Sequence, residues 1–260
     1  MIDVSEQALI DRVVELLSAS QNLLFVTGAG LSADSGLPTY RGVGGLYDVD
    51  DTEDGLPIEE LLSGHMMQTR PELTWKYLKQ IADACKDATF NRGHEVIAEM
   101  ERHFERVWTL TQNVDGFHRQ AGSQTVIDIH GDLHELVCTA CGARDVLIDF
   151  DGTPLPPRCF DCREVMRPNV VLFGEMLPVD KSIRLREELE RGFDIVFSIG
   201  TSSLFPYISE PLIMAAKSGT ATVEINPGES EISDIVDVKL TMRAAEALDR
   251  IWAGFQEAAV

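Results

Sequence analysis

The sequence contains few basic side chains and no long apolar run. Its 260 residues carry 22 Lys and Arg against 43 Asp and Glu, which gives a net charge of −21. This shortage of positive charge argues against nucleic-acid binding, which needs a basic surface. The acidity would attract a cationic partner, or it simply keeps the protein in solution. No stretch approaches the ~18 to 20 apolar residues of a membrane span, so we expect no membrane insertion.

The N-terminus lacks the basic start of a signal or transit peptide. Residues 1–20, MIDVSEQALIDRVVELLSAS, are acidic and amphipathic instead. A hydrophobic content of 44% without low-complexity tracts or repeats is typical of a globular, enzyme-like chain. We therefore expect a cytoplasmic protein.

Cysteines are few, and four of the five form a regular pattern. Cys138-x-x-Cys141 is followed, after 17 residues, by Cys159-x-x-Cys162. Two such pairs place four thiolates around one tetrahedral Zn²⁺ and leave no position for water, so a structural metal is expected. A disulfide framework is the alternative, which an intracellular location disfavours. We expect Cys85 to be an inert thiol, and His134 to lie beside the zinc site without binding the metal.

Short apolar runs, each ending in small or polar residues, recur along the chain. They read as buried parallel strands separated by helix-length segments. In an open parallel sheet, ligands bind beyond the carboxyl ends of the strands, so the clusters that end these runs should gather at one site. The runs are 23–26, 107–110, 126–129, 195–199 and 223–225.

The apolar periodicity also predicts helices, two of them in the first of two insertions. Ser5 is a plausible N-cap for a helix over 5–20. Residues 42–88 read as a helical lid with helices near 58–63 and 72–84, and residues 133–171 as a zinc module with too few apolar residues to fold without metal. Further elements are expected at 91–102 (helix), 180–191 (helix), 206–217 (helix), 236–240 (strand) and 243–257 (helix).

These elements predict an α/β fold. Its expected form is a doubly wound, Rossmann-like parallel sheet with a smaller inserted domain, made of the helical lid and the four-cysteine zinc module. Residues 1–41, 89–132 and 172–260 would form an NAD-binding domain, and residues 42–88 and 133–171 the small domain.

Several motifs in the loops are more specific than the strand pattern. They are GAGLSADSGLPTYRG, TQNVDGFH, IHGDLHELVC, RPNVVLFGEMLP, SIGTSS and VEINP, which occur in this order together with the paired cysteines. From about Gln21 to Ile251 the chain resembles the sirtuins, the silent-information-regulator family of NAD-dependent protein lysine deacylases. The resemblance implies that the acyl-lysine oxygen displaces nicotinamide from NAD and that a histidine then activates a ribose hydroxyl. Lysine, nicotinamide and an O-acyl-ADP-ribose are the implied products.

The resemblance also implies roles for individual residues. His130 matches the general base, and an imidazole suits proton transfer near neutral pH. Asn113 matches a second catalytic residue, and Asn113 and Asp115 match the nicotinamide-ribose pocket. Without the resemblance, His130 would read as a turn or core residue, and Asn113 and Asp115 as helix caps. The implied NAD contacts are Gly28, Ala29, Gly30, Tyr40, Arg41, Gln112, Asn113, Asp115, His130, Gly200, Thr201, Ser202 and Asn226.

One segment matches the strand along which the substrate peptide lies in the family. The residues implied in substrate binding are Val171, Phe173, Gly174 and Glu175. A peptide would add there as an extra strand through backbone hydrogen bonds. The side chains of Val171 and Phe173 would wall the acyl-lysine tunnel or, with equal weight, belong to the core.

The lid sequence bears on the acyl group that is removed. Sirtuins that remove succinyl groups carry a Tyr-x-x-Arg pair, whose phenol and guanidinium bind the acyl carboxylate. Here Tyr77 is followed by Gln80, and the better aligned pair is Leu78 with Ile81. Since the arginine is missing in either alignment, we expect acetyl or longer uncharged acyl groups to be preferred over succinyl.

Two other functions use the same features. Mono-ADP-ribosyl transfer cleaves the same cofactor but uses another acceptor, and a non-catalytic NAD sensor could use the zinc module for protein contacts. The presence of His130, Asn113 and Asp115 favours deacylation over both. The expected partners are acyl-lysine proteins or peptides, and no feature of the sequence sets an oligomeric state.

Overall fold

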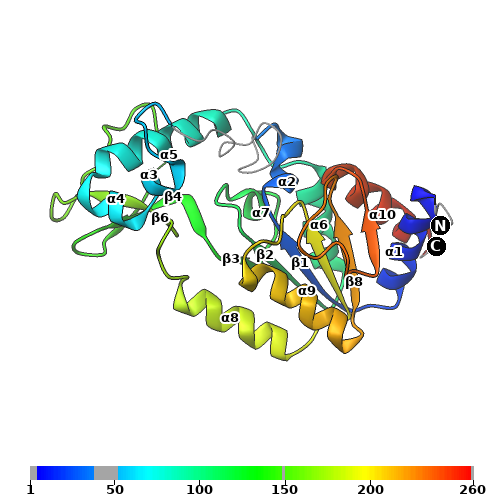
Figure 1. Ribbon diagram of the computed structural model, residues 1–260. Coiled ribbons are helices and arrows are strands. Elements are labelled where there is room, and N and C mark those ends of the chain that lie inside the picture. Colours follow the sequence, from blue (N-terminus) through cyan, green and yellow to red (C-terminus); the bar gives the residue numbers. More distant parts are fainter. Residues whose placement is uncertain (1–4, 38–51, 148–149, 259–260) are drawn as a thin grey trace.

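The computed structural model describes residues 5–37, 52–147 and 150–258, and its largest element is a six-stranded parallel sheet (Figure 1). The strand order is β3-β2-β1-β7-β8-β9. The chain adds β2 and β3 on one side of β1 and later adds β7, β8 and β9 on its other side, so the order reverses between β1 and β7. All five predicted apolar runs and the short strand near 236–240 are strands of this sheet, so the predicted doubly wound fold is confirmed. The strands are β1 (Asn22–Thr27), β2 (Arg106–Thr111), β3 (Val126–Asp128), β7 (Ile195–Ile199), β8 (Ala221–Ile225) and β9 (Val238–Leu240).

Helices cover both faces of this sheet. Along β1, Leu23 and Phe25 face one apolar core, whereas Leu24 and Val26 face another. Burial on both faces is the reason why the strands read as unbroken apolar runs. The first core includes α1 (Glu6–Ser18), α6 (Arg92–His103) and α10 (Ala244–Ala258), and the second includes α8 (Val179–Glu190) and α9 (Pro206–Ser218) (Figure 1).

Helix ends follow the expected chemistry. The hydroxyl of Ser5 accepts a hydrogen bond from the Ala8 N–H at 3.3 Å, which confirms the predicted N-cap of α1. The side chain of Asn91 caps α6 in the same way by accepting from the Gly93 N–H. At its other end, α9 stops at Gly219, whose φ of 77° few other residues adopt.

A second, antiparallel sheet lies with the lid helices, at the left of Figure 1. Its order is β5-β4-β6, formed by β5 (Arg144–Val146), β4 (Gly131–Cys138) and β6 (Met166–Val170). The sequence analysis did not predict this sheet. The lid contributes α3 (Ile58–Leu61), α4 (Gly64–Thr69) and α5 (Pro71–Cys85).

One apolar core joins the lid to the antiparallel sheet. Trp75 is fully buried in it, and its indole N–H donates to the Met166 carbonyl of β6 at 3.0 Å. Leu133 and Leu136 of β4 and Leu78 of α5 belong to the same core. The zinc segment therefore shares a core with the lid, although it has too few apolar residues to build one alone.

The remaining described elements are short. They are α2 (Ala29–Ser32), a 3-10 helix over Ala33–Ser35, and α7 (Phe117–Gln120). Within the described ranges, none of the helices combines the length and apolar character that crossing a bilayer requires.

Gly131 links the two sheets and has no room for a side chain. It follows His130, begins β4, and adopts a φ of 89°. A Cβ there would lie 1.9 Å from the carbonyl oxygen of Asn169. We expect Gly131→Ala to lower the free energy of unfolding by roughly 2 to 5 kcal/mol, because left-handed strain and a backbone clash add. Denaturant titration of the purified variant measures this loss.

Gly219→Ala is the matched control for that prediction. Gly219 also has a positive φ, of 77°, but its Cβ would meet no atom within 4 Å. The control should lose only about 1 to 2 kcal/mol, from the left-handed conformation alone. Equal losses in the two variants would mean that the Asn169 carbonyl moves aside at little cost.

Candidate active site

The segments that follow the strands of the large sheet meet at one edge. Gly28 follows β1, Gln112 follows β2, and His130 lies in the turn between β3 and β4. Gly200 follows β7, and Asn226 follows β8. The structure thus brings the sequence-predicted residues of five separate segments to the carboxyl ends of the parallel strands, where ligands bind in such sheets.

Two of these loops touch through their backbones. The Gly30 N–H donates to the Gly200 carbonyl oxygen at 2.7 Å. A Cβ on Gly30 would lie 2.6 Å from the Gly200 Cα, and one on Gly28 would lie 2.8 Å from the Thr201 Cβ. The sequence analysis assigned these glycines to contacts with NAD. In the structure, the lack of a side chain at Gly28 and Gly30 is what allows the two loops to touch.

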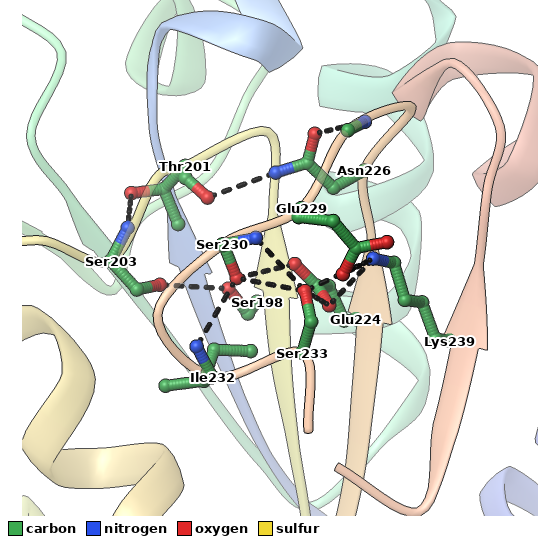
Figure 2. Close-up of polar contacts among 11 residues, drawn as sticks. Ser198, Thr201, Ser203, Glu224, Asn226, Glu229, Ser230, Ile232, Ser233 and Lys239 are labelled. Atoms are coloured by element: carbon green, nitrogen blue, oxygen red, sulfur yellow. Dashed lines mark hydrogen bonds and ion pairs between the residues drawn. The ribbon is translucent and has the colours of Figure 1, made fainter. Parts of the chain in front are cut away.

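Gln112, Thr201 and Asn226 form one hydrogen-bonded group. The Gln112 amide donates to the Thr201 hydroxyl at 2.8 Å. The Asn226 amide donates to the Thr201 carbonyl oxygen at 3.0 Å, as Figure 2 shows. The neighbouring Ser202 side chain is exposed. Three residues predicted to bind NAD, which follow β2, β7 and β8, therefore position one another.

A buried carboxylate anchors the loop that follows Asn226. Glu224 of β8 accepts hydrogen bonds from the hydroxyls of Ser230 at 2.5 Å and Ser233 at 2.7 Å. The ammonium group of Lys239 lies 3.9 Å from the Glu224 carboxylate and 2.6 Å from that of Glu229 (Figure 2). Because this charge is paired and hydrogen-bonded, its burial is tolerated, and it holds the loop beside Asn226 in place.

Ser32 connects the two pocket residues Asn113 and Asp115. The Asn113 amide donates to the Ser32 hydroxyl at 3.0 Å and to the Gly28 carbonyl oxygen at 3.1 Å. The Ser32 hydroxyl donates to the Asp115 carboxyl at 2.7 Å. The sequence analysis did not select Ser32, although it lies inside the quoted motif GAGLSADSG.

Asp115 is half-buried and has two protein partners. Its second oxygen accepts from the Phe117 N–H at 2.9 Å, but Asp115 is not the cap considered from the sequence, because the N-cap of α7 is Gly116. Burial raises the pKa of Asp115, while the hydrogen bonds from Phe117 and Ser32 oppose the increase. A carboxylate at this position can accept hydrogen bonds from a ligand.

His130 has a defined tautomer. Its Nδ1 lies 3.0 Å from the Gln112 carbonyl oxygen, which only accepts hydrogen bonds, so the neutral ring carries its proton on Nδ1. Its Nε2 lies 2.7 Å from the hydroxyl of Tyr207, a residue that the sequence analysis did not select. Burial lowers the pKa of His130 and Lys181 lowers it further, against the hydrogen bond to Gln112. The ring is therefore neutral near pH 7 and offers Nε2 as a base.

Two other histidines have structural partners. His118 is buried, with Nε2 2.9 Å from the Thr27 hydroxyl, and its ring lies 5.0 Å from the ring of His94. Burial lowers the pKa of His94 to about 4 and that of His118 well below its usual range. Both stay neutral in the core, where their role is structural.

The segment expected to bind substrate peptide connects three parts of the fold. The Val171 N–H donates to the His130 carbonyl oxygen at 2.8 Å. The Phe173 N–H donates to the Leu62 carbonyl oxygen, and the Phe173 carbonyl oxygen accepts from the Gly64 N–H, both at 3.0 Å. β6 ends at Val170, so this segment is extended chain beyond the strand that was expected there.

Glu175 has protein partners for both carboxylate oxygens. The guanidinium of Arg167 donates to them at 2.5 and 2.8 Å, and the Leu172 N–H donates at 2.9 Å. Gly174, beside it, is exposed and has a φ of 81°. The Glu175 side chain thus shapes the turn at this position.

Tyr40 and Arg41, also expected to bind NAD, lie outside the described residues. Ala29, between the two glycines, begins α2 and is half-buried.

The four paired cysteines form one cluster. The sulfurs of Cys138, Cys141, Cys159 and Cys162 all lie within 4.8 Å of one another, with 3.4 and 3.6 Å between the closest pairs. Four sulfurs at a Zn–S distance of about 2.3 Å are about 3.8 Å apart in a tetrahedron, so the cluster fits Zn²⁺. The imidazole Nδ1 of His134 is instead 3.0 Å from Asp132, outside this group.

Zinc at this cluster would have a structural role. We expect a zinc-specific chelator to lower the melting temperature of the protein, because the four-thiolate site supplies folding free energy that its sparse core lacks. Catalytic activity should fall in parallel with the loss of folded protein and return when Zn²⁺ is restored. Retention of fold and activity after complete metal removal, checked by metal analysis, would contradict the structural role.

Comparison with known proteins agrees with this geometry. The model of the Sir2 family matches residues 28–205. The "NAD-dependent protein deacylase 2" of Pseudomonas aeruginosa is 50% identical over 245 residues, covering 93% of this chain and 95% of that protein.

Solved structures are similar over nearly the whole chain. A Sir2 homologue in complex with NAD is 35% identical with a TM-score of 0.85, covering 96% of this chain and 95% of that one. A Sir2 structure with a deacetylated p53 peptide and 3′-O-acetyl ADP-ribose is 29% identical with a TM-score of 0.83, covering 94% and 97%. Since the family model spans more than half of the chain and relatives match almost all of it, the chain belongs to the Sir2 family, the sirtuins.

Proposed function

We propose that the protein is an NAD-dependent protein lysine deacylase in which His130 is the general base. The observation that carries this assignment is the tautomer of His130. The Gln112 carbonyl keeps the proton on Nδ1, so the unprotonated Nε2 can accept a proton. Membership of the Sir2 family and the NAD complex of a structural relative support the choice of cofactor.

The residues at the sheet edge divide the work of binding NAD between them. When bound, NAD supplies the ribose carbon that the acyl oxygen attacks and the ribose hydroxyl that later takes the acyl group. Asn113 and Asp115 bind the nicotinamide ribose and the carboxamide, and Gln112 contacts a ribose. The phosphates and adenosine are held by the remaining predicted contacts, namely Gly28, Ala29, Gly30, Tyr40, Arg41, Gly200, Thr201, Ser202 and Asn226.

The acyl-lysine protein or peptide binds along residues 171–175. The exposed backbone around Gly174 pairs with the substrate backbone, and Val171 and Phe173 line the lysine tunnel. The hydrogen bond from Val171 to the His130 carbonyl supports this arrangement, because it keeps the substrate segment next to the base.

The division of the chain expected from the sequence is part of this proposal. Residues 1–41, 89–132 and 172–260 bind NAD, while residues 42–88 and 133–171 form the small domain. The shared core of the lid and the zinc module supports the grouping. A thiolate zinc site also supports a cytoplasmic location, where thiols stay reduced.

His130→Ala should abolish deacylation. Without the imidazole no group takes the ribose proton, so we expect product formation to fall by about 10² to 10⁴-fold. An acetylated lysine peptide with NAD, followed by mass spectrometry of the deacylated peptide, measures this loss. His65→Ala, which removes an exposed histidine of α4, is the control and should retain full activity.

The same assay distinguishes the alternative functions. Nicotinamide release without peptide, together with labelled ADP-ribose on a protein acceptor, would favour ADP-ribosyl transfer. No nicotinamide release with any acyl peptide would favour an NAD sensor.

Acyl preference depends on two residues of α5. Leu78 is buried in the lid core, and Ile81 packs against that core. The Tyr77 hydroxyl donates to Asp54 at 2.7 Å and is therefore not available to a ligand. We expect acetyl and longer uncharged acyl peptides to have a kcat/KM at least about tenfold above succinyl peptides, since burying a carboxylate without a partner is costly.

A double variant tests the positions themselves. Leu78→Tyr with Ile81→Arg should raise the kcat/KM for succinyl peptide, because the new pair can bind the carboxylate. Gln80→Arg is the matched control, since it adds the same charge one residue away and should give no gain. A larger gain from the control would assign the acyl site to Tyr77 and Gln80 instead.

A further inference from the structure

Tyr207 forms a short contact with the base that no sequence motif indicated. Its hydroxyl lies 2.7 Å from Nε2 of His130. The ring nitrogen is the acceptor, because the proton of the neutral imidazole is on the other nitrogen, where the Gln112 carbonyl accepts it. The phenol therefore donates to Nε2.

The loop before α9 holds Tyr207 in this place. Ser203 has the uncommon φ of 55°, and its N–H donates to the Thr201 hydroxyl at 3.1 Å. Phe205 stacks on the Tyr207 ring with centroids 5.6 Å apart and planes 12° apart, and its edge meets the His130 ring. A non-glycine residue with positive φ indicates that the local structure imposes a conformation, here one that directs α9 toward the base.

The Tyr207 phenol is hydrogen-bonded to the Nε2 lone pair that has to accept the proton in the proposed reaction. A neutral imidazole has a single lone pair, on Nε2 in this tautomer, so it accepts one hydrogen bond in the ring plane. Lys181, the charged group that acts on His130, is occupied by hydrogen bonds to the backbone and carboxylate of Asp128. Burial raises the pKa of Tyr207 to about 12, so the phenol stays protonated. A proton that reaches Nε2 in this arrangement comes from the phenol.

We propose that Tyr207 is a proton relay between the ribose hydroxyl and His130. Tyr207 accepts the proton of the ribose hydroxyl on its oxygen while it gives its own proton to Nε2. One O–H bond breaks and one forms at the phenol, so Tyr207 ends neutral and His130 ends as imidazolium. The electron pair of the ribose O–H bond stays on the ribose oxygen, which attacks the acyl carbon. This proposal rests on the assignment of His130 as general base.

The relay affects one of the two chemical steps. Departure of nicotinamide needs no proton at Nε2, whereas attack by the ribose hydroxyl does. Exchange of labelled nicotinamide into NAD reports the first step, and formation of deacylated peptide under single-turnover conditions reports both. A role confined to folding or cofactor binding would change the two rates together.

Tyr207→Phe keeps the ring and its stacking on Phe205 and removes only the hydroxyl. We expect deacylation to fall about 10- to 100-fold, with nicotinamide exchange within twofold of the wild type. A plot of the deacylation rate against the D₂O fraction of the solvent should change from a curve, which indicates two transferred protons, to a straight line, which indicates one. Tyr77→Phe is the matched control, because it removes a hydroxyl with an equally short 2.7 Å hydrogen bond to Asp54. It should leave the ratio of the two rates unchanged.

A measurement without cofactor or substrate tests the contact itself. In the free protein with ¹⁵N-labelled histidine, we expect Tyr207→Phe to move the Nε2 resonance of His130 to the position of a nitrogen without a hydrogen bond, with Nδ1 still protonated. An unmoved Nε2 resonance would remove the basis of the relay. So would unchanged or faster deacylation in Tyr207→Phe, because the ribose hydroxyl would then replace the phenol at Nε2. If His130→Ala itself keeps deacylation, the assignment of the base fails instead.

Discussion

The backbone contact between Gly30 and Gly200 determines how the rest of the site is arranged. It lies where the strand order of the large sheet reverses, between β1 and β7, and it joins the loops that leave those two strands. From Gly200 the chain continues to Thr201, which holds Gln112 and Asn226. On the other side, the Gly28 carbonyl holds the amide of Asn113. Side chains from several loops thus take their positions from a contact that only glycine permits.

Burial sets the protonation of the groups in this arrangement. It raises the pKa of Asp115 and lowers that of His130, so in each case the uncharged form is favoured. Tyr207 is protonated for the same reason. In the proposed reaction, His130 and Tyr207 are therefore both neutral at the start. Glu224 differs because two hydroxyls and the nearby Lys239 compensate its buried charge, which suits a residue that anchors a loop.

The sequence predicted the features that depend on local pattern. The strands of the large sheet were visible because burial on both faces makes each an unbroken apolar run, and the zinc site was visible from the spacing of Cys138 to Cys162. The antiparallel sheet was not, because its strands are not unbroken apolar runs and its core is completed by Trp75 and Leu78 of a distant helix. Ser32 and Tyr207 were missed for a related reason. Each owes its role to a partner far along the chain, and neither residue type carries a signal by itself.

The position of His130 explains how the zinc module matters to chemistry in which zinc takes no part. The turn that carries His130 ends β3 of the large sheet and leads directly into β4 of the small one. The backbone of His130 also accepts a hydrogen bond from Val171, just after β6, and both β4 and β6 continue to the cysteine cluster. The side chain of His130, in contrast, is held by Gln112 and Tyr207 of the large sheet's loops and helices. The backbone of His130 is therefore attached to the small sheet and its ring to the large one, so the β4–β6 pair beside the cysteine cluster helps to set the position of the proposed base.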